Sequence, residues 1–254
     1  MRFKLSMGLL FAAAAILPSF ASANDFGDCN SKNPVKILNG CTAVIETGKE
    51  SAENVAIAYL IRGLEQKKRS NPVKALQDLD MGIALYPKIV DPRIAAAHYI
   101  RGGVYFSQRK YKEAIDDYSQ SILLNPKNTE ANRMRGISYR YSYLDAELPN
   151  LRNASSELAD SNLLQLAIKD FNVFLQKFPN NAEVLTERGT AYFQALNNYT
   201  VESAKPALDD FSKAISINPK YMNAYSERSS LYGAIGENTK SEQDQKMVKT
   251  LEGQ

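Results

Sequence analysis

The chain has very few of the side chains that bind metals or carry redox chemistry. Among its 254 residues there is no tryptophan, one histidine (His98) and only two cysteines, Cys29 and Cys41. These counts exclude a zinc site of three histidines, a site of four cysteines and an iron–sulfur centre. We therefore expect neither a metal nor a cofactor.

A strong excess of charge of either sign is also missing. Lys and Arg number 31 and Asp and Glu 28, which gives a net charge of +3. A nearly neutral chain has no bulk field to hold a polyanion, so we expect no nucleic-acid partner. Apolar residues make up 44% of the chain, a globular value that rules out wholesale disorder.

The sequence also lacks the motifs of common catalytic sites. It contains no glycine-rich phosphate loop, no nucleophile elbow and no H-E-x-x-H pair. His98 lies on an expected helix, where a packed core imidazole is the more common role. We expect no catalytic residue and no enzyme activity.

Residues 1–23 have the pattern of a secretory signal peptide. Arg2 and Lys4 precede an apolar run that is too short to span a bilayer, and Pro18 ends that run. Small residues up to Ala23 then form a cleavage site, although an uncleaved anchor is the alternative. We expect cleavage after Ala23, a periplasmic or secreted protein, and no stable membrane insertion after cleavage, because no later stretch is apolar enough to span a membrane.

Export places the two cysteines in an oxidising compartment, which favours a structural disulfide between Cys29 and Cys41. Their spacing is not C-x-x-C, so a thioredoxin-type redox role has little support. The bond would close a loop of about a dozen residues and stabilise the fold by roughly 3 kcal/mol. Two free thiols, one of them buried, are the alternative.

After the leader, the chain repeats itself. Ile100-Arg101-Gly102-Gly103-Val104-Tyr105 returns 34 residues later as Met134-Arg135-Gly136-Ile137-Ser138-Tyr139, and further copies occur around Arg62, Arg188 and Arg228. A small residue, an aromatic four later and a proline twelve later follow several of these segments, as in Ala114, Tyr118 and Pro126. The apolar spacing is helical, so each unit is predicted to be two helices, the second ended by proline. The recurrent glycine indicates a close approach of the two helices.

This pattern resembles the tetratricopeptide repeat family, in its exported bacterial form. The resemblance covers residues 56–254 and implies an all-α, right-handed solenoid of five helix pairs, with copies at about 56–89, 95–128, 129–181, 182–221 and 222–254. The family's first-helix tryptophan is replaced in every copy, by Tyr59, His98, Asn132, Leu185 and Tyr225. Residues 24–55, containing one helix-like segment, are expected to form a disulfide-tied half-repeat that caps the first copy, because terminal repeats lack a neighbour.

The third copy is too long. Its glycine and alanine, Gly136 and Ala167, are 31 residues apart, against 12 for the same pair in the second copy. The extra residues predict a loop from Leu144 to Asn153 and a long helix from Ser155 to Lys177. The insertion, residues 140–166, is expected to project from one side of the solenoid, and six further residues are inserted in the fourth copy near Tyr199.

The resemblance implies that the first helices line a concave groove. The candidate partner-binding residues there are aromatic or arginine, the usual interface anchors: Tyr99, Phe106, Arg133, Arg140, Tyr141 and Phe193. Rim or core contacts are the alternative for any one of them.

We expect a non-enzymatic interaction scaffold or adaptor of the cell envelope that binds a partner helix or peptide in this groove. The alternative is a structural, self-associating envelope component that uses the 140–166 insertion. Neither the partner's identity nor the oligomeric state follows from the sequence.

Arginine precedes the glycine position in all five copies, and aspartate recurs three residues after the small residue of the second helix. We expect a ladder of five ion pairs that fixes the helix register, since the arginine fork can hold a carboxylate with two bonds. Similarity left over from duplication is the alternative. The pairs are Arg62–Asp78, Arg101–Asp117, Arg135–Asp170, Arg188–Asp210 and Arg228–Asp244.

Overall fold

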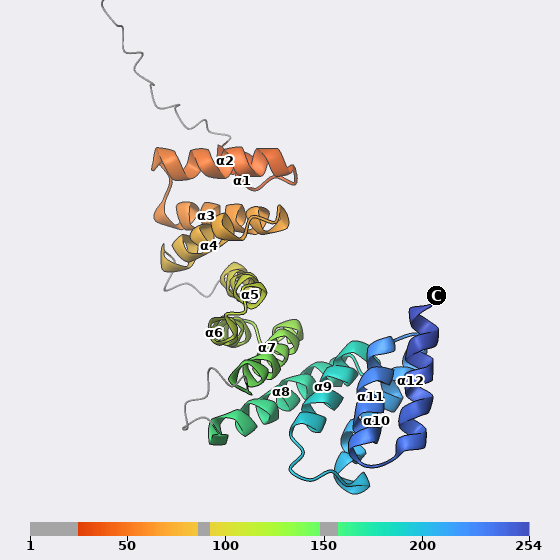
Figure 1. The fold of residues 1–254 in the computed structure, drawn as a ribbon. Helices are drawn as coiled ribbons and strands as arrows, with labels where there is room; N and C mark the ends of the chain where they lie inside the picture. The colour runs from red at the N-terminus through yellow and green to blue at the C-terminus, as the bar shows by residue number, and fades with distance from the viewer. Residues whose placement is uncertain (1–24, 86–91, 148–156, 254) are drawn as a thin grey trace, which may run out of the picture.

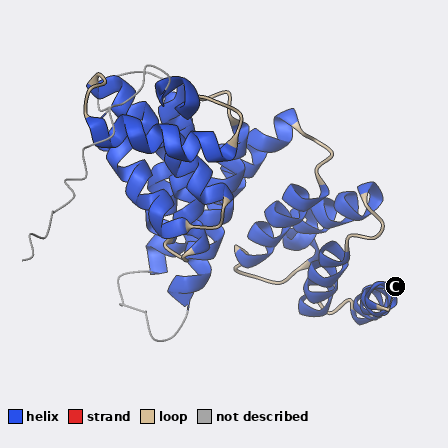
Figure 2. Ribbon diagram, turned by 90° about the horizontal axis from the view of Figure 1, so that it is seen from above, coloured by secondary structure: helices blue, strands red, loops and turns tan. Residues whose placement is uncertain are grey.

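The computed structural model describes residues 25–85, 92–147 and 157–253, and this part of the chain is built from helices and loops (Figures 1 and 2). The expected signal peptide, residues 1–23, lies outside the described residues. The helices are α1 (Asp25–Cys29), α2 (Pro34–Thr47), α3 (Ala52–Lys68), α4 (Pro72–Leu85), α5 (Pro92–Ser107), α6 (Tyr111–Leu124), α7 (Thr129–Glu147), α8 (Glu157–Lys177), α9 (Ala182–Gln194), α10 (Val201–Ile217), α11 (Met222–Ala234) and α12 (Asn238–Glu252).

From α3 onward the helices form five antiparallel pairs, α3–α4 to α11–α12, stacked one after another (Figure 1). Each first helix also contacts the first helix of the next pair, whereas within the described ranges no such contact joins the second helices of neighbouring pairs. The stack therefore curves, with the first helices on its inner side. The expected all-α solenoid of five helix pairs with an additional N-terminal unit is confirmed. Within the described residues, no helix is both long and apolar enough to span a bilayer.

Local signals set the helix ends. The Asn181 side chain accepts a hydrogen bond from the Val184 amide at the start of α9, and Thr200 forms a capping box with Ser203 at the start of α10. α10 stops two residues before Pro219. The expected loop from Leu144 begins later than predicted, because α7 continues to Glu147. Residues 148–156, which include most of that loop and the expected caps of α8, lie outside the described part of the chain.

The repeated glycine is required by the aromatic residue of the second helix. A Cβ on Gly189 would lie 2.6 Å from the Phe211 ring, and one on Gly136 would lie 2.8 Å from the Phe171 ring. Both rings are fully buried. The close approach that the sequence predicts is therefore chiefly between glycine and this ring, rather than between glycine and the small residue of the second helix.

All five arginine–aspartate pairs form, and each is held by two hydrogen bonds. The Nε and Nη2 atoms of each arginine donate to the two carboxylate oxygens over 2.6–2.9 Å. The aspartate side chains are 3–8% exposed and the arginines 18–21%. The predicted ladder is confirmed, and each of its pairs joins the two helices of one repeat.

The third guanidinium nitrogen of each arginine links its repeat to the one before. Nη1 donates to a side-chain oxygen on the preceding repeat's second helix or, for Arg62, on α2, over 2.6–3.0 Å. The acceptors are Thr42, Asp80, Ser119, Asn172 and Ser212. The ladder therefore has a direction: every arginine reaches toward the N-terminus.

The effect of a ladder pair on a pKa is clearest for the Asp117 carboxyl. Burial alone would raise the pKa of this carboxyl, but the hydrogen bonds from Arg101 and His98 outweigh burial and hold the pKa below its usual value. His98 contributes through Nδ1, which lies 2.8 Å from Asp117 Oδ1. The single histidine is thus packed beside a ladder pair, with its side chain 12% exposed.

The N-terminal unit is a short hairpin of α1 and α2. Cys29 ends α1 and is bonded to Cys41 in α2, with an S–S distance of 2.07 Å. The helices are so close that a Cβ on Gly40 would lie 2.5 Å from the Cys29 backbone nitrogen. Val44 and both cysteines are fully buried in a cluster that includes Ala58 of α3. This unit therefore covers the otherwise open end of the first repeat.

Candidate partner-binding surface

Three aromatic rings from two adjacent repeats meet where the end of α5 and the start of α6 contact α7. Phe106 of α5 lies 5.4 Å from Tyr111 of α6 and 5.6 Å from Tyr141 of α7, and the two tyrosine rings are 5.7 Å apart. Phe106 and Tyr141 are half-buried. The structure thus brings two of the candidate residues together, and Tyr111 joins them although sequence reasoning did not select it.

Tyr99 and Arg133 lie one repeat apart on the same inner side. The Tyr99 ring packs 5.7 Å from the buried Tyr118 ring, and burial raises the pKa of the Tyr99 hydroxyl. Arg133 donates to Glu130 over 2.7 Å and to Glu183 of the next repeat over 3.0 Å. Both side chains are half-buried. Tyr99 and Arg133 act on each other electrostatically, so they lie near each other across the boundary between the second and third repeats.

Arg140 differs from the exposed anchor that the sequence suggests. It is 8% exposed, donates from Nε to Glu187 of α9 over 2.8 Å, and its guanidinium lies 4.9 Å from the centre of the Tyr141 ring. Glu187 is 47 residues away in the chain, so no local pattern reveals the pairing. Arg140 is a buried link between the third and fourth repeats, and replacing it would perturb the fold.

Two glutamates on the inner side of the fourth and fifth repeats were not among the candidates. Burial raises the pKa of Glu227, and repulsion from Glu187 adds to this, while Arg140 and a hydrogen bond from Thr190 oppose it. Glu187 and Glu227 occupy the same place in successive copies, directly before the ladder arginine. That recurrence is the signal that could have identified them.

Phe193, the last candidate, lies away from the other five. Its ring meets Tyr199 edge to face at 6.3 Å, and Tyr199 is 53% exposed in the turn between α9 and α10. The structure therefore places the six candidates in three groups: Phe106 and Tyr141 with the buried Arg140 against the Tyr141 ring, the Tyr99–Arg133 pair, and Phe193 at the fourth-repeat turn.

Stacked helical hairpins with an inner layer of first helices define a helical-repeat solenoid, a class of interaction protein. A model of the tetratricopeptide repeat matches residues 95–128, which are α5, α6 and their connections. The matched segment is one of five in-register copies, so the match and the fold together support a tetratricopeptide-repeat protein.

Comparisons with known proteins agree with this assignment. The chain is 26% identical over 184 residues to the mitochondrial import receptor subunit TOM70 of Homo sapiens, a match that covers 72% of this chain but only 26% of TOM70. Among solved structures, MamA from Desulfovibrio magneticus RS-1 superposes with a TM-score of 0.60 at 16% identity, covering 78% of this chain and 94% of MamA. YrrB, described as a TPR protein with an unusual peptide-binding site, superposes with a TM-score of 0.59 at 19% identity, covering 83% and 91%. At these identities the structures show the shared fold.

Proposed function

We propose that the protein is a non-enzymatic scaffold or adaptor of the cell envelope that binds a helix or an extended peptide of a protein partner along its inner side. The observation that carries this proposal is the cluster of Phe106, Tyr111 and Tyr141, with Tyr99 and Arg133 further along the same first helices, α5 and α7. Large rings that are pre-packed against one another lose little conformational entropy when a partner covers them, which suits them to binding.

Two observations support a place in the cell envelope. Residues 1–23 have the sequence pattern of a leader for export. The bonded pair Cys29–Cys41 fits an oxidising compartment, because disulfides seldom persist in a reducing cytosol.

The inner side is tested with the double variant Tyr99→Ala/Arg133→Ala, which spares the buried Arg140. The matched control is Tyr199→Ala/Lys205→Ala, whose two side chains are exposed away from the proposed surface. Periplasmic crosslinking followed by mass spectrometry identifies partners. Loss of about 2 kcal/mol per anchor should remove their capture by the double variant, with a melting temperature still close to that of the wild type.

Undiminished capture of the same partner by the double variant, with the control also unchanged, would contradict this site. Crosslinks chiefly to a second copy of the chain, with a dimer or larger species in gel filtration with light scattering, would favour the self-associating alternative. The insertion at 140–166 that this alternative invokes lies partly outside the described residues.

A further inference from the structure

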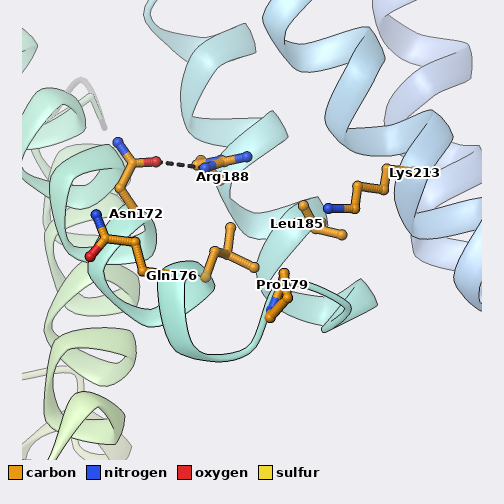
Figure 3. Close-up of a pocket in the computed structure, with 7 residues that line it drawn as sticks. Asn172, Gln176, Pro179, Leu185, Arg188 and Lys213 are labelled. Carbon is orange, nitrogen blue, oxygen red and sulfur yellow. Dashed lines mark hydrogen bonds between the residues drawn. The ribbon is translucent and has the colours of Figure 1, made fainter.

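A pocket of about 370 Å³ opens between the third and fourth repeats, on the side of α9 that faces the second helices. Asn172 and Gln176 of α8 line one wall and Lys213 of α10 the opposite wall, with Leu185 and Arg188 of α9 between them (Figure 3). Leu175 and Pro179 add apolar surface. The pocket is separate from the inner side proposed above, whose contacts come from α5, α6, α7 and the start of α9.

One residue that lines the pocket, Leu185, differs in kind from its equivalents in the other repeats, which stand three positions before each ladder arginine. Tyr59 and Tyr225 stand there in the first and fifth repeats, and their rings lie 5.6 and 5.8 Å from the guanidinium carbons of Arg62 and Arg228. In the second and third repeats, His98 and Asn132 reach the ladder aspartate instead. Leu185 is too short and too apolar to do either.

Arg188 differs from the other four ladder arginines in the residue three positions before it, which is neither aromatic nor polar. Arg101 and Arg135 have a ring four residues after them, from Tyr105 and Tyr139 at 5.9 and 5.8 Å, and Tyr192 stands in the equivalent position beside Arg188. Hydrogen bonds to Asp210 and Asn172 fix the Arg188 guanidinium in place, so it borders the open pocket in one defined position.

The opposite wall carries a cation that the other repeats lack. The residues equivalent to Lys213 are Met81, Gln120, Val173 and Met247. Lys213 is exposed, and no carboxylate of the described residues pairs with it. The pocket thus has apolar walls, the Arg188 guanidinium on one side and the Lys213 ammonium at its rim. This combination suits a ligand with an aromatic ring and a carboxylate close to that ring.

We propose that this pocket binds an aromatic side chain of a protein partner, whose ring takes the place that Tyr59 and Tyr225 fill in their own repeats. The ring lies against Arg188 and Leu185, and a neighbouring carboxylate of the same partner pairs with Lys213. The fourth repeat thus holds a second docking site, independent of the inner side.

The probe is N-acetyl-phenylalanine, added to the isotope-labelled mature protein and followed by amide chemical shifts. We expect shifts confined to α8, α9 and α10 with millimolar affinity. The probe should bind more tightly than N-acetyl-phenylalaninamide, which lacks the carboxylate, and N-acetyl-alanine, which lacks the ring, should not bind. Absence of shifts in these helices, or equal binding of all three compounds, would overturn the proposal.

Two variants localise the site. Leu185→Tyr restores the ring of the first and fifth repeats and should weaken binding more than tenfold. Lys213→Met introduces the residue that those repeats carry at the rim and should weaken binding roughly fivefold, the worth of an exposed ion pair. Lys205→Met, on the same helix and 71% exposed, is the charge-matched control and should bind like the wild type.

Wild-type affinity in Lys213→Met, or an equal loss in Lys205→Met, would refute the role of the rim. Wild-type affinity for the probe in a folded Leu185→Tyr protein would refute binding in this pocket. If Leu185→Tyr does not fold, Lys213→Met still tests the proposal, because Lys213 is exposed. The Tyr99→Ala/Arg133→Ala variant should bind the probe normally, which separates this site from the proposed function.

Discussion

The two ends of the solenoid are closed by different chemistry. At the N-terminal end, α1 and α2 are joined covalently through Cys29 and Cys41, and their backbones meet at Gly40. At the C-terminal end the close crossing is polar: the hydroxyls of Ser229 and Ser241 each donate to the other residue's carbonyl oxygen over 3.0 Å. Serine fits in place of glycine there because Gln245 stands where the second, third and fourth repeats carry an aromatic ring.

The direction of the ladder explains why the N-terminal end needs the stronger closure. Each ladder arginine takes its third acceptor from the unit before it, so Arg62 requires a preceding helix, and Thr42 of α2 provides the oxygen. Most side chains of α12, the second helix of the fifth repeat, are exposed. The two ends of a repeat array are therefore not equivalent when every ladder arginine donates its third hydrogen bond to the preceding unit.

The largest expected effect comes from removing a ladder arginine in the interior. Arg135→Leu leaves Asp170, 3% exposed, without its two charged hydrogen bonds and should lower the free energy of unfolding by about 3 kcal/mol. Arg228→Leu breaks an equally buried pair, but the terminal repeat can unfold alone, so global stability should fall less. Urea denaturation measures both, with the exposed Lys205→Leu as a control for a lost cation; equal losses in all three variants would contradict the ladder.

Removing the covalent closure should have the next largest effect. Cys29→Ser/Cys41→Ser should lower the free energy of unfolding by at most roughly 3 kcal/mol, because the bond restricts the unfolded chain. The loss is smaller if the N-terminal unit unfolds separately from the repeats. Hydrogen exchange should show faster opening confined to α1, α2 and α3. Thiol labelling of the denatured, non-reduced wild type should find no free cysteine, and two labelled thiols in protein isolated from the periplasm would contradict the bond.

The polar closure is expected to contribute least. Ser241→Ala removes the hydroxyl that donates to the Ser229 carbonyl and should lower stability by about 1 kcal/mol, with faster amide exchange in α11 and α12. Ser230→Ala is the matched control, since its exposed hydroxyl bonds only within α11, to Ser226. A larger loss in Ser230→Ala than in Ser241→Ala would show that the crossing is not held by this pair.

Features that repeat along the chain could be predicted from the sequence. The five helix pairs and the arginine–aspartate ladder follow from residues that recur in register, because each copy presents the same local geometry. The glycine requirement was predicted, although its main partner is the ring at Phe171 or Phe211 rather than the small residue.

Features that depend on two distant copies could not be predicted. The burial of Arg140 depends on Glu187 in the next repeat, and the aromatic cluster depends on Tyr111 meeting Tyr141 across a repeat boundary. The pocket beside Arg188 is lined by residues of α8, α9 and α10, and the pattern of a single copy does not show which residues of two repeats meet there.

The central claim, that paired arginines and aspartates hold the two helices of each repeat in register, is tested most directly by a double-mutant cycle. Unfolding free energies are measured for the wild type, Arg135→Leu, Asp170→Leu and the double variant. If the ladder pair acts as one unit, the double variant should lose about 2 kcal/mol less than the sum of the single losses, because it leaves no buried charge unpaired. Losses that add to within about 0.5 kcal/mol would show that the two side chains act independently and would contradict the ladder.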